Sequence, residues 1–169
     1  MGAHSIIQYV KYSAQAKGRH GTHSPFVYDF VETVTLNKEP LRGELLFTDS
    51  GLELKYENLL NRLAHRYNYK TVLALPLLED IMLHPSVDMM VLDDSNPAQW
   101  QQHYDQFALL LEDHSAVAIC GIHKTPAHTA AWDKMRASAP VRMSLNLFGV
   151  GILLFRKEFK EKQHFLLKY

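Results

Sequence analysis

The sequence lacks the features that mark secreted, membrane-spanning and polyanion-binding proteins. One cysteine in 169 residues cannot form a disulfide framework within the chain. Lysine plus arginine and aspartate plus glutamate both number 18, which leaves no net charge to attract nucleic acid or acidic membrane. No apolar run reaches the roughly 18 residues of a membrane span, and the first residues do not form a signal peptide. We therefore expect a soluble, cytoplasmic protein without nucleic-acid or membrane partners.

Common catalytic and metal-binding patterns are missing as well. No G-x-S-x-G occurs, so the sequence does not support a Ser-His-Asp hydrolase. Among ten histidines, His20 and His23 form a compact pair, but no cysteine pair or second histidine pair lies at ligand spacing, and we expect no metal site. Cys120 lies inside an apolar run and is interpreted as an inert core thiol.

Two short apolar runs, residues 71–75 and 87–92, organise what is present. Each has apolar residues at consecutive positions and is stopped by Pro76 or by Asp93 and Asp94, which is typical of a strand covered on both faces. The pattern predicts a parallel α/β sheet. The chain length fits one domain, with a helical lead-in over residues 1–52 and an α/β core over residues 53–169.

Helical spacing precedes the first run. Ile6, Val10 and Ala14, with Ile7 beside them, predict a short amphipathic helix that Gly18 ends in a left-handed conformation. Ser24 and Pro25 begin a second helix that ends near Asn37, residues 38–52 are expected to form a loop, and a third helix over residues 56–67 lies on the sheet.

Helices and strands alternate after the second run. Asn96 to Gln99 caps a helix whose apolar stripe is interpreted as core, and the stripe comprises Trp100, Tyr104, Phe107, Ala108 and Leu111. A strand over residues 116–120 is followed by a helix that opens at Thr125-Pro126. Residues 143–155 read as an antiparallel hairpin with a tight turn, and residues 164–169 as a further edge strand.

Three segments resemble one family of enzymes. They are KGRHGTHSPFVYDFV at residues 17–31, LNLFGVGILLFRKE at residues 145–158 and HFLLKY at residues 164–169. They resemble the class I S-adenosylmethionine-dependent methyltransferases, in particular a subgroup of small O-methyltransferase-like proteins from Bacteroidetes. The resemblance implies a three-layer Rossmann-like methyltransferase fold, with a reduced, mostly parallel sheet, a C-terminal antiparallel hairpin and N-terminal helices.

The cofactor turn departs from the family pattern. In that family an acidic-x-Gly-x-x-x-Gly turn after the first strand lets the backbone approach the methionine part of the cofactor, and a later acidic residue binds the ribose. Here Pro76, Leu77 and Leu78 follow the strand without a glycine, and eleven residues replace two βα units. We expect no bound cofactor, and no cofactor-binding residue is assigned.

The catalytic pattern is also reduced. Asp93 matches an acidic position of the family, and of the Asp-Asp-x-His that follows the next strand only His123 is present. Asp93 and His123 are therefore the candidate catalytic residues, although a solvated strand end also explains Asp93. One remaining aspartate argues against bound Mg²⁺, which prefers several oxygen ligands.

A second candidate site precedes the second helix. Lys17, Arg19, His20, His23 and Ser24 lie near a helix start that suits an anion such as a carboxylate or phosphate. The competing interpretation is that Arg19 and His23 anchor the loop to the edge of the sheet. A general ligand-binding module that uses this loop is a third functional class.

Two functional hypotheses follow. The first is a degenerate, non-catalytic methyltransferase-like protein with an interaction or structural role. The alternative is an active small-molecule O-methyltransferase that binds S-adenosylmethionine in an atypical or intersubunit site. The deletion leaves residues 71–75 at an edge of the sheet, so we expect that edge to pair in a homodimer or with another protein, or to be covered by the N-terminal helices. The eleven-residue crossover is short for parallel strands and leaves the pairing of residues 71–75 open.

Overall fold

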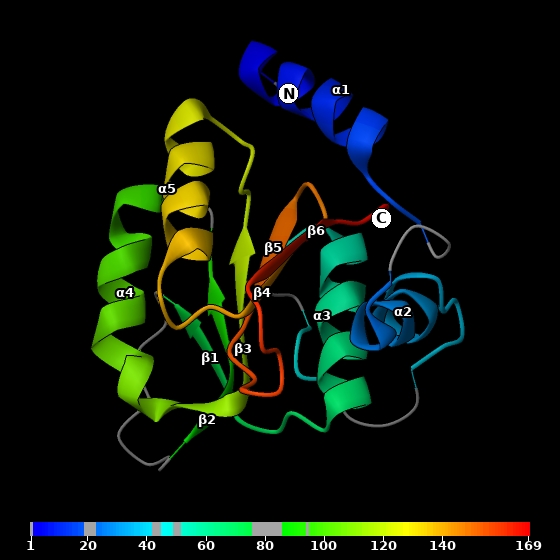
Figure 1. Ribbon diagram of the computed structural model, residues 1–169, viewed down its shortest axis with the longest axis vertical. Helices are drawn as coiled ribbons and strands as arrows, with labels where there is room; N and C mark the ends of the chain where they lie inside the picture. The colour runs from blue at the N-terminus through cyan, green and yellow to red at the C-terminus, as the bar shows by residue number, and fades with distance from the viewer. Residues whose placement is uncertain (1, 19–22, 42–44, 49–51, 76–85, 94) are drawn as a thin grey trace.

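The computed structural model describes residues 2–18, 23–41, 45–48, 52–75, 86–93 and 95–169. It is an α/β structure in which helices cover both faces of one six-stranded sheet (Figure 1). The elements, in chain order, are α1 (Ala3–Gln15), α2 (Pro25–Phe30), the π-helix η2 (Val31–Thr35), α3 (Leu54–Tyr67), β1 (Val72–Leu75), β2 (Val87–Leu92), the 3₁₀-helix η4 (Pro97–Gln99), α4 (Trp100–Phe107), the 3₁₀-helix η5 (Ala108–Leu110), β3 (Leu111–Cys120), α5 (Pro126–Ala137), β4 (Met143–Asn146), β5 (Val150–Leu154) and β6 (Gln163–Leu166).

The sheet is mixed. Its strand order is β1-β2-β3-β5-β4-β6. β1, β2 and β3 are parallel, β5 runs antiparallel to both of its neighbours, and β6 is parallel to β4. The expected α/β class and the terminal hairpin are confirmed. Parallel pairing joins β1 to β2, β2 to β3 and β4 to β6, and the two pairs that involve β5 are antiparallel.

Two apolar clusters cover the two faces of the sheet. On one face α2, η2 and α3 pack against side chains such as Met89, Ala118 and Ile152. On the other, α4 and α5 pack against alternate residues of the same strands, such as Met90, Val117 and Leu153. Because the central strands are covered on both sides, their apolar residues occupy consecutive positions, as their sequence indicates.

Three helix starts lie where the sequence places them. Ser24 caps α2 by accepting a hydrogen bond from the backbone N–H of Val27, and a proline follows at the first helical position. Asn96 caps η4 and Thr125 caps α5 in the same way, each with a proline next. Local chemistry alone decides these boundaries, because a capping oxygen and a fixed proline φ favour a helix start in any context.

Two helix ends differ from the sequence prediction. α1 ends at Gln15 because Ala16 is extended, not because Gly18 turns left-handed. The extended backbone lets Lys17 form an isolated bridge to Leu167, with its N–H donating to the carbonyl of Leu166 at 2.8 Å. Leu111 does not continue the helical stripe of α4; it begins β3 and pairs with Val87.

β1 lies at an edge of the sheet, as the sequence predicts, and pairs in parallel with β2, Val72 beside Met89. The contacts of α1 are with Thr129, Phe148 and Leu167, on other elements than β1. Residues 76–85, which include the predicted cofactor turn at Pro76 to Leu78, lie outside the described residues. Within the described ranges, no helix is long and apolar enough to cross a membrane.

Candidate functional site

A cleft of about 590 Å³ opens where β3 ends. We call it the strand-end cleft. Its walls come from the amino ends of α1 and α3, the segment after β3 and the turn between β4 and β5. The lining residues are Gly2, Ser5, Leu52, Glu53, Lys55, Tyr56, Cys120, Gly121, His123, Lys124, Phe148 and Gly149. Carboxyl ends of parallel strands are where open α/β sheets bind ligands, so this cleft is the main candidate site.

Two glycines shape the floor of the strand-end cleft. Gly121 has a φ of 70°, in the left-handed region that glycine adopts most readily, and its N–H donates to the carbonyl of Gly149 at 2.7 Å. Gly149 lies directly beneath Tyr56: a Cβ at residue 149 would lie 1.8 Å from the Tyr56 hydroxyl oxygen. The absence of a side chain at Gly149 therefore lets α3 approach the hairpin turn this closely.

His123 is buried and hydrogen-bonded at both ring nitrogens. Nε2 lies 2.9 Å from the side-chain nitrogen of Asn146, and Nδ1 lies 3.2 Å from the hydroxyl of Thr129. The side-chain oxygen of Asn146 accepts a hydrogen bond from the N–H of Phe148, which leaves the amide NH₂ facing the ring. His123 Nε2 is therefore an acceptor, and Nδ1 carries the proton.

The surroundings of His123 favour its neutral form. Burial is the main cause that lowers the pKa of His123 below its usual value. A proton on Nε2 would also point at the NH₂ group of Asn146, whose orientation is fixed by Phe148. The imidazole is thus a neutral structural group that ties α5 to the end of β4, and it has no ring nitrogen available for a substrate proton.

Further polar groups of the cleft lie at the start of α3, in addition to Ser5 of α1 and Lys124 after β3. Lys55 Nζ lies 3.5 Å from a carboxylate oxygen of Glu53 and 4.5 Å from the centre of the Tyr56 ring. Burial raises the pKa of Tyr56, although the neighbouring ammonium of Lys55 opposes that effect. The phenol is therefore protonated at neutral pH and can serve as a hydrogen-bond donor, not as a base.

The structure does not bring the two candidate catalytic residues together in the strand-end cleft. Asp93 is not among the residues that line it. Its carboxylate accepts hydrogen bonds from the N–H and the hydroxyl of Ser95, at 3.1 and 2.7 Å, and its backbone carbonyl accepts the indole N–H of Trp100. Asp93 thus shapes the turn that starts η4, while His123 lies after the next strand.

The candidate anion site is only partly described. Lys17, His23 and Ser24 line one open cleft of about 790 Å³, together with Glu158 and Glu161. The hydroxyl of Ser24 caps α2, and the carboxylates offset the positive charge. Arg19 and His20 lie outside the described residues. Within the described ranges, no group of three or more histidine, cysteine, aspartate or glutamate residues is arranged to hold a metal ion.

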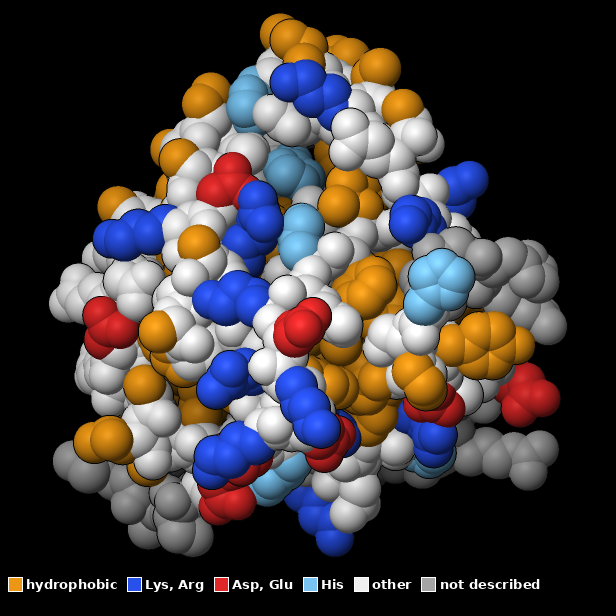
Figure 2. Space-filling model, viewed as in Figure 1, with side chains coloured by type: hydrophobic (Ala, Val, Ile, Leu, Met, Phe, Trp, Pro, Cys, Tyr) orange, Lys and Arg blue, Asp and Glu red, His pale blue; other side chains and the backbone are white. Residues whose placement is uncertain are grey.

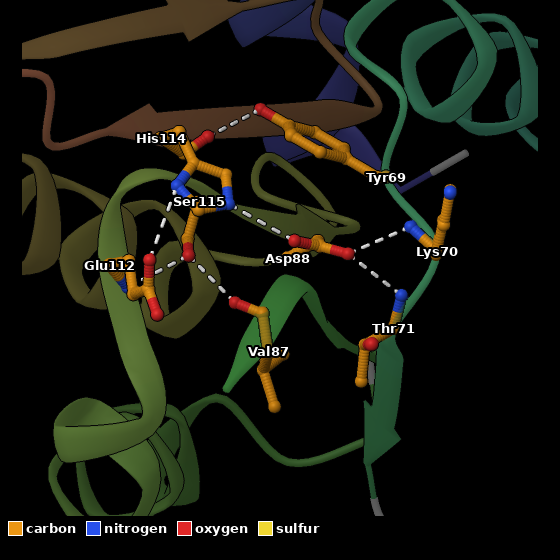
Figure 3. Close-up of polar contacts among 8 residues, drawn as sticks. All are labelled: Tyr69, Lys70, Thr71, Val87, Asp88, Glu112, His114 and Ser115. Carbon is orange, nitrogen blue, oxygen red and sulfur yellow. Dashed lines mark hydrogen bonds and ion pairs between the residues drawn. The ribbon is translucent and has the colours of Figure 1, made fainter. Parts of the chain in front are cut away.

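A polar network at the opposite ends of the strands was not predicted from the sequence. Asp88, in β2, accepts hydrogen bonds from the backbone N–H groups of Lys70 and Thr71, at 2.8 and 2.9 Å (Figure 3). Its other carboxylate oxygen lies 3.1 Å from Nε2 of His114. The sequence feature that could have predicted this network is the single acidic residue inside an otherwise apolar strand. A carboxylate in such a place needs hydrogen-bond donors.

The same network lies at a break in the regular pairing of β2 with β3. The pairing register shifts between Val87 and Met89. There the Ser115 hydroxyl donates to the carbonyl of Val87 at 2.6 Å and accepts the N–H of Glu112 (Figure 3). Burial, the largest influence, raises the pKa of Asp88, but its hydrogen bonds together hold that pKa below the usual value. The network therefore stabilises strand pairing with an ionised carboxylate.

Searches with this chain found no matching family model, no similar curated protein and no similar solved structure.

Proposed function

We propose that this chain is a degenerate, non-catalytic relative of the S-adenosylmethionine-dependent methyltransferases with an interaction role. The observation that carries the proposal is the hydrogen bonding and the placement of His123 and Asp93, the two residues that match the family's catalytic pattern. Each has structural hydrogen-bond partners, and they do not share a cleft. A neutral histidine with both nitrogens engaged does not supply general acid–base catalysis.

The sheet supports the resemblance on which this proposal rests. The family's mostly parallel sheet ends in a reversed strand, and here the reversed β5 lies between β3 and β4. Under this proposal the fold is a reduced, Rossmann-like methyltransferase fold. Its strand-end cleft is partly filled by Tyr56, whose hydroxyl lies against Gly149.

Calorimetric titration with S-adenosylmethionine and S-adenosylhomocysteine tests the loss of cofactor binding. We expect no saturable heat at micromolar protein. Saturable binding with a micromolar Kd, about −8 kcal/mol, would overturn the proposal in favour of an active O-methyltransferase. Repeating the titration with Lys55→Gln and with Leu109→Gln would then locate the ligand. Of these two residues Lys55 lines the strand-end cleft and Leu109 does not, so a ligand in that cleft should bind more weakly to Lys55→Gln alone.

A further inference from the structure

The helix α1 directs its apolar stripe away from the protein. Ile6, Ile7 and Val10 are 53%, 55% and 62% exposed, and Ala3 and Ala14 on the same stripe are also exposed. These positions follow the i, i+3, i+4 spacing of one helix face. The apolar stripe of an amphipathic helix usually faces the core, yet in the isolated chain this one is open to solvent.

The polar and aromatic face of α1 holds it to the domain instead. Ser5 and Tyr12 are buried, and the hydroxyl of Tyr12 donates to the carbonyl of Leu167. The ring of Tyr9 meets Phe148 edge-on with centres 5.1 Å apart, and His4 Nε2 lies 3.0 Å from the hydroxyl of Thr129. With these anchors in place, the apolar stripe cannot turn inward without breaking them.

α1 also projects from the protein. It lies at the top of Figure 1, above α3 and to one side of α5, and Figure 2 shows hydrophobic side chains among basic and polar ones at the top of the surface. Leu54, 71% exposed, lies between Glu53 and Lys55, which line the strand-end cleft together with Gly2 and Ser5 at the amino end of α1. A projecting helix can meet another helix without collision of the two domains.

We propose that the α1 stripe (Ala3, Ile6, Ile7, Val10 and Ala14) docks against the same stripe of a second copy of this chain, with the two helices antiparallel across a two-fold axis. The proposal rests on the interaction role proposed above and names its partner. It places the contact on α1, not on the β1 edge that the sequence favours.

Self-complementarity favours a second copy as the occupant. A two-fold contact must match one patch to itself. With the axis between Gln8 and Tyr9, Ile7 faces Val10 of the second copy, and Ala3 faces Ala14, so small residues lie at both ends of the contact. Lys11 is the only lysine, arginine, aspartate or glutamate in α1, the chain has no net charge, and antiparallel helix dipoles attract each other.

The size of the surface sets the expected affinity. A helix of 13 residues is about 20 Å long. One such helix, extended by Leu54, presents less area than the roughly 800 Å² per partner of a standard interface. We therefore expect a dimer that dissociates on dilution, with a Kd in the micromolar range.

Sedimentation equilibrium of the full chain, from low micromolar to submillimolar concentration, tests the contact. Ile7→Glu should weaken dimerisation at least about 30-fold, because the variant dimer would bury two carboxylates at its centre. Leu109→Glu is the matched control, since Leu109 is 97% exposed and lies in η5, away from α1. It should leave the dimer unchanged.

Cross-linking tests the antiparallel register. An oxidised mixture of the single variants Ile7→Cys and Val10→Cys should give more disulfide-linked dimer than either variant alone, because residue 7 faces residue 10. The native Cys120 is buried and does not compete. Equal yields in all three samples would overturn the register.

Other outcomes distinguish this inference from the proposed function. A monomer at every concentration, with no cofactor heat, overturns the dimer and leaves the proposed function standing. The chain could instead be a monomer that binds neutral lipid vesicles and loses that binding in Ile7→Glu. This result would assign the stripe to a lipid surface and would also overturn the dimer. Saturable cofactor binding by an intact dimer overturns the proposed function alone.

Discussion

The two ends of the parallel strands differ in how their polar groups are used. At the amino ends, the carboxylate of Asp88 binds two backbone N–H groups and a histidine, and Ser115 bridges two strands. At the carboxyl ends, the strand-end cleft keeps an open volume with Lys55 and Tyr56 at its wall. The amino end is a closed network that fixes strand pairing, whereas the carboxyl end keeps the space in which a ligand would bind.

The contrast shows that holding strands together and keeping a cleft open depend on different residues of this chain. Removal of hydrogen-bond partners at the amino end should change stability directly. Changes in the open cleft should cost stability only where backbone and side chain are in direct contact, as at Gly149.

The largest effect is expected at the amino end. Asp88→Ala should lower the free energy of unfolding by about 2–3 kcal/mol, because it leaves the N–H groups of Lys70 and Thr71 without their acceptor. Asp88→Asn is the control: one amide oxygen can still accept both N–H groups, so it should cost about half as much. Urea unfolding measures both values. Equal losses in the two variants would show that charge, not the backbone contacts, carries the stabilisation.

A smaller effect is expected at the carboxyl end. Gly149→Ala should lower the free energy of unfolding by about 1–2 kcal/mol, because its methyl group collides with the Tyr56 ring. A double-mutant cycle with Tyr56→Ala isolates that collision. The glycine substitution should be nearly neutral in the Tyr56→Ala background. An undiminished loss in that background would assign it to the turn backbone and not to Tyr56.

The smallest expected effect is on the pH dependence of stability, which differs between the two ends of the strands. The pKa of His123 is lowered by burial, so its unfolded form binds more protons below about pH 6.5 and stability is lost as pH falls through that value. The pKa of Asp88 is also lowered, so its contribution is kept above about pH 3.8 and lost only as pH falls further.

Between pH 7.5 and pH 5, the change in unfolding midpoints that His123→Gln causes therefore reports on the carboxyl end. His123→Gln should reduce the loss of stability over this range. Asp88→Asn should leave the slope unchanged there, because Asp88 stays ionised throughout. A slope that Asp88→Asn alone reduces would contradict this assignment. The burial of His164, followed by the charge of Arg136, lowers the pKa of His164 to about 4. The parent protein therefore also loses stability over this pH range, and the slope of each variant is compared with the slope of the parent.

Sequence patterns predicted the parts of the fold that local chemistry decides. The caps at Ser24, Asn96 and Thr125 are confirmed, and so are the hairpin and the edge position of β1. In each case a few neighbouring residues fix the backbone, because a side-chain oxygen or a proline acts within one turn.

The features that were missed depend on distant residues. The periodicity of α1 is correct, but which face is buried was decided by Phe148 and Leu167, far along the chain. Gly18 did not end α1 because β6 offered Lys17 a bridge partner. The role of Asp88 requires Lys70, Thr71 and His114 to meet, which no local pattern shows.

The anchors of α1 also set the order in which the protein is completed during translation. His4 is 125 residues from Thr129, and Tyr12 is 155 residues from Leu167. At about 5–20 residues per second, the ribosome needs roughly 6–30 s to make the residues that hold α1. During that interval residues 3–15 lack the contacts that hold α1 to the domain, so their apolar side chains stay exposed on the nascent chain.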